Sequence, residues 1–196
     1  MLIVTNIVYG KQKLNRKKVE KNMAKEIEIE KKYKVKRLPE NLEKYEHKTI
    51  EQSYLNRGGS PIRLRKFIKE KEIHCVFSKK VKVEKGSIEC IENNIELPEK
   101  IYQDLLEAKE GRTILKTRYI IPLEDGLKVE IDIFHDFFEG VCVAEIEFNS
   151  IEQAKNYTVP SWLGEELTGE KKMTNVYMAT KADDISEYEE YIIKKQ

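Results

Sequence analysis

Hydrophobic and polar residues alternate along most of the chain after Met23, and this alternation predicts β-strands. Side chains at positions i and i+2 share one face of a strand, so a period of two marks a strand with two different faces. Short groups rich in Gly, Pro, Asp and Lys separate the runs and are typical of hairpin connections. Eight strands are predicted, near residues 25–36, 48–56, 61–69, 72–81, 87–96, 112–121, 127–134 and 141–148.

Short helical segments are predicted between and after these strands. A helix after Pro98 would place Ile101, Leu105 and Ala108 on one face. Ser150, with a glutamine three positions later, is typical of a capping box. The sequence therefore predicts a mostly β, α+β domain whose remaining helices cover residues 39–45, residues 150–157 and the amphipathic segment 183–195.

The first 22 residues depart from the strand pattern. An apolar start over residues 2–8 precedes a basic stretch over residues 11–21. A secretory signal has these regions in the opposite order and ends in a small-residue cleavage site. We predict a weakly ordered extension over residues 1–22 and a single domain over residues 23–196. A basic tail that contacts nucleic acid is the alternative interpretation of the extension.

Composition narrows the class of protein. Charged residues make up 36% of the 196 residues, yet the 36 basic and 35 acidic residues leave a net charge of only +1. This balance argues against a nucleic-acid-binding protein, which would usually show a basic excess. No apolar run approaches the length of a transmembrane helix. The cysteines at 75, 90 and 142 form no C-x-x-C pair, which favours reduced, buried thiols in a cytoplasmic protein.

Five of the predicted strands carry charges of one sign at positions i and i+2. A solvated sheet face has no reason to segregate charge strand by strand, because like charges on neighbouring positions are destabilising. The acidic pairs are Glu28 and Glu30, Glu130 and Asp132, and Glu145 and Glu147; the basic pairs are Arg63 and Arg65, and Lys116 and Arg118, with Lys32 continuing the first strand.

A closed barrel would bring these charged faces together around one interior. About eight strands are enough to close a sheet and remove its edges. Inward-facing carboxylates would repel each other by about 4 kcal/mol per close pair at an effective dielectric constant of ~20, unless they held protons or a hard cation. Inward-facing Lys and Arg would need anions such as phosphate. A polyphosphate bound with Mg²⁺ or Mn²⁺ satisfies both walls, and a bound metal ion can activate water without a Ser, Cys or His nucleophile.

Several short motifs occur in an order that carries a family resemblance between about residues 25 and 180. They are E-x-E-x-K at Glu28 to Lys32, then Gln52-Ser53-Tyr54-Leu55, Arg63-Leu64-Arg65, Ser78-Lys79-Lys80, Lys116-Thr117-Arg118, Glu130-Ile131-Asp132, Glu145-Ile146-Glu147 and a closing segment from Trp162 to Asn175. In this order the chain resembles the CYTH family, or triphosphate tunnel metalloenzymes. That family groups bacterial inorganic triphosphatases, class IV adenylyl cyclases and animal thiamine triphosphatases.

The resemblance implies a closed eight-stranded antiparallel barrel and a division of labour among its charges. Glu28, Glu30, Glu130, Asp132, Glu145 and Glu147 would bind metal, and Lys32, Arg63, Arg65, Lys80, Lys116 and Arg118 would bind phosphates. Strand parity favours Lys80 over Lys79. Lys32 would act either on the attacking water or as a plain phosphate clamp. Many members carry R-x-E-x-E on the fifth strand, where this chain has Cys90, Glu92 and Asn94, so only Glu92 remains a candidate there.

The expected activity is metal-dependent hydrolysis of inorganic triphosphate, with nucleoside triphosphates as further substrates. An adenylyl cyclase is the alternative within the family; it would need an adenine site that the sequence does not reveal. Thiamine triphosphatase would need an aromatic surface beside the tunnel, and Trp162 is better explained as a packing residue. A non-catalytic polyphosphate-binding module should have lost its metal-wall carboxylates. No nucleic-acid or membrane partner is expected, and a monomer and a homodimer remain equally open.

Overall fold

The computed structural model describes residues 23–55, 61–84 and 87–193, except for the side chains of residues 23–26 and 125. The predictions for residues 1–22, and the glycine pair of the hairpin before Pro61, lie outside this range. The strands of the described part are β1 (Met23–Val35), β2 (Glu46–Leu55), β3 (Ile62–Lys69), β4 (Glu72–Lys82), β5 (Glu89–Leu97), β6 (Glu110–Pro122), β7 (Lys128–Phe134), β8 (Cys142–Glu147) and β9 (Leu163–Glu166).

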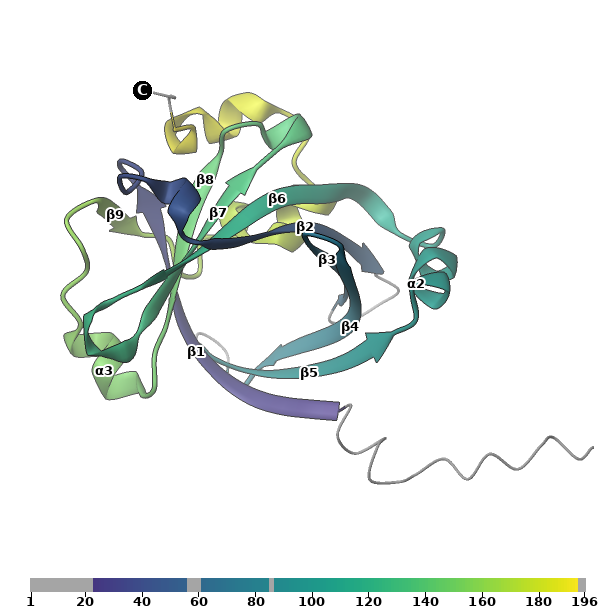
Figure 1. Cartoon of the computed structure of the whole chain (residues 1–196), viewed down its shortest axis with the longest axis horizontal. Coiled ribbons are helices and arrows are strands. Elements are labelled where there is room, and N and C mark those ends of the chain that lie inside the picture. Colours follow the sequence, from purple (N-terminus) through teal and green to yellow (C-terminus); the bar gives the residue numbers. More distant parts are fainter. Residues whose placement is uncertain (1–22, 56–60, 85–86, 194–196) are drawn as a thin grey trace, which may run out of the picture.

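These strands form one antiparallel sheet that closes on itself (Figure 1). Its order is β5-β4-β3-β2-β6-β7-β8-β1-β9, and an additional pairing between β5 and β1 completes the ring. β1 is long enough to serve two neighbours, because Met23–Ile29 pairs with β5 and Glu30–Lys34 pairs with β8. The closed eight-stranded antiparallel barrel is thus confirmed. The short β9, which extends the sheet beside the end of β1, was not predicted because its four residues show no alternation.

Apolar side chains pack on the outside of the barrel. Ile131, Ala144 and Ile146 are fully buried there, together with Tyr33 of β1 and Leu163 of β9. They occupy the strand positions that alternate with the charged ones, so the interior of the barrel is left to the charged residues. The main core of this protein therefore lies between the barrel wall and the segments that cover it.

Two of the predicted helices are α-helices that pack outside the ring. α3 (Ile151–Asn156) begins as predicted, because Ser150 Oγ accepts the Gln153 N–H at 3.0 Å. α2 (Glu99–Leu106) follows Pro98, and Leu105 packs against the barrel as predicted. Ile101 was wrongly placed on that face: it is 44% exposed, whereas Tyr102 is completely buried against β3 and β4. A tyrosine ring offers more apolar surface to the sheet than the isoleucine beside it.

The remaining helical predictions need correction. Residues 39–45 contain only a single 3-10 turn, η1 (Leu42–Lys44). The C-terminal amphipathic α-helix is instead a 3-10 helix, η5 (Ile185–Tyr191), which buries Tyr188. A preceding pair, the 3-10 helix η4 (Lys171–Met173) and α4 (Asn175–Thr180), was not predicted. Shorter 3-10 turns, η2 (Glu124–Gly126) and η3 (Asp136–Phe138), occupy predicted hairpin connections.

α4 closes one end of the barrel. At that end the inward side chains change from charged to apolar, and Tyr54, Ile114 and Phe134 pack there with Met178 and Ala179 of the helix. Figure 1 shows the C-terminal segments against β6, β7 and β8. The polar part of the interior is therefore bounded on one side by an apolar cluster. No helix in the described ranges has the length and apolar character needed to cross a bilayer. All three cysteines are buried and unpaired, as predicted.

Candidate functional site

A cavity of about 490 Å³ occupies the charged part of the barrel interior. All eight barrel strands contribute to its lining, because each presents alternate residues inward. All six predicted phosphate-binding cations line it, and so do five of the six predicted metal-binding carboxylates. The lining includes Lys32, Arg63, Arg65, Lys80, Lys116, Arg118, Glu28, Glu30, Glu130, Glu145 and Glu147.

Asp132 is the predicted residue that does not line the cavity. It lies opposite Val143, at the level where the interior becomes apolar, and it is 1% exposed. Its carboxylate accepts from Lys116 Nζ at 2.6 Å and from Arg118 Nε and Nη2, each at 2.6 Å. Burial raises the pKa of Asp132, but Arg118 and Lys116 outweigh it and leave this pKa lowered. Asp132 thus binds two cavity-lining cations without lining the cavity itself.

Two arginines and Glu92 form the basic side of the cavity. Arg63 Nη2 and Arg65 Nη2 each lie 2.5 Å from Glu92 Oε1, and Arg65 also donates to Ser78 Oγ at 2.9 Å and Asn94 Oδ1 at 3.1 Å. Burial raises the pKa of Glu92, but Arg63 and Arg65 overcome this and lower it to about 2. The fifth strand therefore contributes Glu92 to the site as an arginine partner, on the same face as Cys90 and Asn94.

Both arginines keep an unsatisfied donor. The Nε atoms of Arg63 and Arg65 are buried and have no hydrogen-bond partner in the described part of the chain. A buried donor without a partner costs about 1–3 kcal/mol. Guanidinium N–H groups match the oxygens of phosphate in a planar fork. The side chains of both arginines line the cavity.

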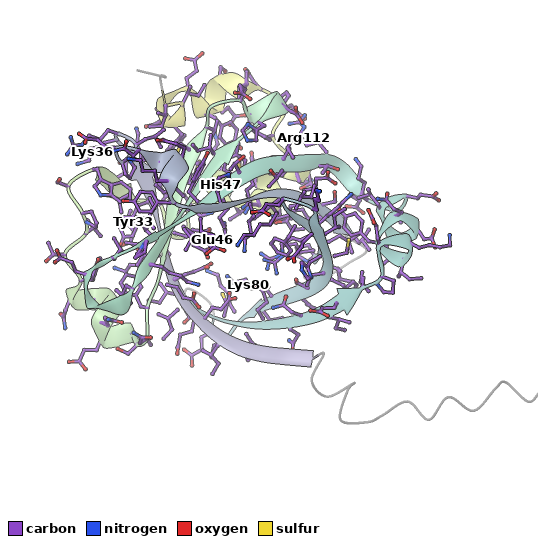
Figure 2. The ribbon with its side chains drawn as sticks, viewed as in Figure 1. Tyr33, Lys36, Glu46, His47, Lys80 and Arg112 are labelled. Carbon is purple, nitrogen blue, oxygen red and sulfur yellow. The ribbon has the colours of Figure 1, made fainter. Side chains whose placement is uncertain are left out.

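Lys80 holds the two carboxylates of the E-x-E-x-K motif. Its Nζ lies 2.9 Å from Glu28 Oε2 and 2.6 Å from Glu30 Oε1, and its side chain points into the barrel interior (Figure 2). Burial lowers the pKa of Lys80, but Glu30 and Glu28 outweigh it and raise this pKa overall. Lys79 is exposed on the other face of β4, so the parity argument for Lys80 is confirmed.

Glu145 joins the first strand to Arg118. Lys32 Nζ lies 3.1 Å from Glu145 Oε1 and donates to the Met173 carbonyl oxygen at 2.9 Å. Arg118 Nη2 lies 2.8 Å from Glu145 Oε2, and Arg118 Nη1 contacts Glu130. Burial raises the pKa of Glu145, whereas Lys32 and Arg118 lower it well below its ordinary value. Lys32 is thereby fixed between the acidic wall and the segment before α4.

The acidic wall has the donor chemistry for a hard cation. The strand register places Glu30 opposite Glu147 and Glu130 opposite Glu145, so four carboxylates lie on neighbouring positions of three adjacent strands. Like charges placed in this way are destabilising unless something neutralises them. Here cationic side chains do so, and no three acidic, thiol or imidazole groups of the described residues converge on one point. Carboxylate oxygens are the donor type that a hard divalent cation prefers.

Several lining residues were not predicted. They are Lys48, Gln52, Tyr54 and Phe67 on the basic side, Lys82 and Lys128 near the predicted charges, and Thr174, Asn175 and Val176 before and within α4. The signal for Lys82 and Lys128 was present, since they share the strand parity of Lys80 and Glu130. The α4 contribution had no such signal, because a six-residue helix has no strong period.

The fold and the cavity together define a class: a closed antiparallel barrel whose interior carries opposed acidic and basic walls. A comparison with models of known protein families gives no match. The chain is 34% identical over 94 residues to an inorganic triphosphatase of Nitrosomonas europaea, a match that spans 48% of this chain and 62% of that relative.

Two solved structures of a protein called NE1496 match over nearly their whole length. One, described as a hypothetical protein, is 30% identical, with a TM-score of 0.57 and coverage of 78% of this chain and 97% of that chain. The other, described as the inorganic triphosphatase NE1496, is 28% identical, with a TM-score of 0.58 and coverage of 79% and 98%. The chain belongs to the CYTH family of triphosphate tunnel metalloenzymes.

Proposed function

We propose that this protein is a metal-dependent triphosphatase that hydrolyses inorganic triphosphate inside the barrel. The observation that carries the proposal is the 490 Å³ cavity in which nine basic side chains face six carboxylates. The proposal is supported by the inorganic triphosphatase of N. europaea, to which 94 residues of this chain are 34% identical. That match spans 62% of the relative's length, so the activity of the whole relative is proposed for this chain and is tested below.

The basic wall would hold the phosphates. Arg63 and Arg65 offer unsatisfied Nε donors, and Lys116 and Arg118 continue the same inward face on β6. Phosphoryl transfer depends mainly on positioning and on neutralising charge that is spread over the phosphate oxygens. Asp132 fixes Lys116 and Arg118 from behind, so their side chains do not have to be ordered when the substrate arrives.

The acidic wall would hold one or two ions of Mg²⁺ or Mn²⁺. A bound metal ion supplies a neutralising charge on the phosphates and a water with a lowered pKa. Glu28 and Glu30 of β1 and Glu130, Glu145 and Glu147 of the neighbouring strands provide the oxygen donors. Substrate and carboxylates would exchange partners on binding, because the arginines and lysines that neutralise the carboxylates are the groups that the phosphates need.

Lys32 would act on the attacking water or on the reacting phosphate. Its ammonium donates to Glu145 and to the Met173 carbonyl, and both contacts use N–H donors. This geometry favours orientation of a water or a phosphate oxygen over removal of a proton. Lys32→Arg should therefore keep binding of tripolyphosphate but lower turnover, since a guanidinium cannot occupy the same point.

The test is release of phosphate from tripolyphosphate with Mg²⁺ or Mn²⁺, measured in parallel with release of cyclic AMP and pyrophosphate from ATP. Fast phosphate release without cyclic AMP supports the triphosphatase. Glu28→Gln and Glu147→Gln should each lower metal-dependent turnover by about 100-fold, because even outer partners of metal ligands cost roughly 10–100-fold.

Glu152→Gln is the matched control, because Glu152 is an exposed carboxylate on α3 outside the barrel. Its turnover should equal that of the unaltered protein. Unchanged metal-dependent turnover in both Glu28→Gln and Glu147→Gln would contradict the proposal. Production of cyclic AMP with pyrophosphate would assign the barrel to a cyclase instead.

A further inference from the structure

Lys48 differs from the six predicted cations of the barrel interior. Each of those six lies within ion-pair distance of a carboxylate. Lys48 also lines the cavity and is half-buried, yet within the described ranges its ammonium has neither an ion pair nor a hydrogen bond. A partly desolvated charge without a counterion is costly. An uncompensated cation inside a ligand cavity therefore indicates a position for an anion.

Phe67 holds this cation in place. The Lys48 ammonium lies 5.0 Å from the centroid of the Phe67 ring, and the Arg65 guanidinium lies 5.1 Å from the same centroid. Both distances are within the range of cation–π attraction. Burial is the main cause that lowers the pKa of Lys48, with further lowering by Arg118 and Arg65 and opposition from Glu130 and Glu46. The aromatic ring thus brings two cations together without neutralising either.

Lys48 lies at the end of the cavity that is remote from α4. It is directly opposite Arg118 in the pairing of β2 with β6, whereas Tyr54, which packs with α4, is six residues further along β2. At ~3.3 Å per residue, six residues correspond to roughly 20 Å along the strand. Lys48 and Arg63, which is paired with Tyr54, therefore lie toward opposite ends of the basic wall.

We propose that Lys48, together with Arg65 and Arg118, forms an additional subsite that binds a fourth phosphoryl group of a linear polyphosphate. The inference rests on the proposed triphosphate site and extends it in length. The apolar cluster at the α4 end blocks extension in that direction, so a longer chain has to extend toward Lys48. Lys48 itself needs no partner exchange, because it has no carboxylate to release, whereas Arg65 and Arg118 are each paired with carboxylates.

The experiment compares the full-length protein with Lys48→Met, which keeps an unbranched side chain over Phe67 but removes the charge. KM and Kd are measured with Mg²⁺ for tripolyphosphate and for tetrapolyphosphate. Loss of one charge-assisted contact should weaken tetrapolyphosphate about tenfold. The loss for tripolyphosphate should be at least about fivefold smaller, because that chain ends before Lys48. Lys48→Arg should restore the tighter binding of tetrapolyphosphate relative to tripolyphosphate.

Lys79→Met is the matched control, since Lys79 is an exposed lysine on the outer face of β4. This substitution should leave KM and Kd unchanged for both tripolyphosphate and tetrapolyphosphate. Equal losses for the two substrates in Lys48→Met, or no loss for either, would overturn the subsite. If Lys48→Met does not fold, as judged by circular dichroism, the unaltered protein decides: tighter binding of tetrapolyphosphate than tripolyphosphate supports the subsite, and equal binding overturns it.

Adenosine 5′-tetraphosphate tests whether the fourth phosphoryl group can come from a nucleotide as well as from an inorganic polyphosphate. If it depends on Lys48 as tetrapolyphosphate does, the subsite binds the phosphoryl group of either compound; if only tetrapolyphosphate depends on it, the subsite serves inorganic chains. A protein that neither binds nor hydrolyses tripolyphosphate contradicts the proposed function itself. Normal turnover of tripolyphosphate with no effect of Lys48→Met would instead contradict only the additional subsite.

Discussion

Lys116 and Asp132 form an ion pair where the barrel interior changes from charged to apolar. Both are 1% exposed, and Nζ lies 2.6 Å from Oδ2. Such a pair costs desolvation on both sides and is strongly destabilising only when one partner is removed. Burial is the main cause that lowers the pKa of Lys116, to about 8; Asp132 opposes this and Arg118 adds to it. As a proposed phosphate-binding cation with a pKa of about 8, Lys116 would make phosphate binding sensitive to pH.

We expect KM for tripolyphosphate to rise as pH increases above about 8. Phosphate binds the protonated ammonium, so the attraction is fully present below the pKa of Lys116 in the free protein and is lost as pH rises through it. Lys116→Arg should keep KM flat over the same range, because a guanidinium stays charged. Identical pH profiles of KM for the two proteins between about pH 7 and 9.5 would contradict this.

At the scale of elements, the contact between α4 and β6 decides where the cavity ends. Gly111 of β6 has a φ of +69°, and a Cβ built on it would lie 2.0 Å from the carbonyl oxygen of Ala179. The close approach of the two backbones therefore requires glycine. It seats the helix whose first turn, with Asn175 and Val176, lines the cavity.

Gly111→Ala should lower the free energy of unfolding by about 3 kcal/mol, because the strained φ and the backbone clash add. Urea unfolding measures it. Gly126→Ala is the matched control: Gly126 has a φ of +72° but no atom within 4 Å of an added Cβ, so only the conformational strain of about 1 kcal/mol should appear. Equal effects of the two substitutions would show that α4 is not seated by this contact.

At the scale of the whole molecule, the two charged walls neutralise each other. On the proposed function, a triphosphate would take cations from the carboxylates and leave them free, and a divalent ion would take carboxylates from the cations. Each ligand would therefore prepare the barrel for the other, which would be a positive coupling between the two proposed sites.

We expect this coupling to be visible in thermal unfolding. A non-hydrolysable imidotriphosphate together with Mg²⁺ should raise Tm by more than the sum of the shifts that each produces alone. The coupling should shrink in Glu147→Gln, which removes one carboxylate, and should persist in Glu152→Gln outside the barrel. Additive shifts in the unaltered protein would refute the exchange of partners.

The alternation of charged and aliphatic residues was enough to predict the eight strands and the inward face of the five that carry paired charges. Strand parity is local, so Arg63 with Arg65, or Glu145 with Glu147, point the same way whatever the rest of the chain does. The sign of the charge on each strand then limited the ligand to one that carries both an anion and a cation. Most of the site could be named for this reason.

What the sequence could not supply depends on distance along the barrel and on contacts between remote segments. The pairing of β1 with β5, the seating of α4 against Gly111 and the partnering of Lys80 by Glu28 and Glu30 each join residues far apart in the chain. Parity says that Asp132 and Lys48 point inward, but not at what height. Packing places Asp132 beside the apolar cluster, behind Lys116, and leaves Lys48 in the cavity without a carboxylate, because position along the barrel axis depends on the register of all eight strands together.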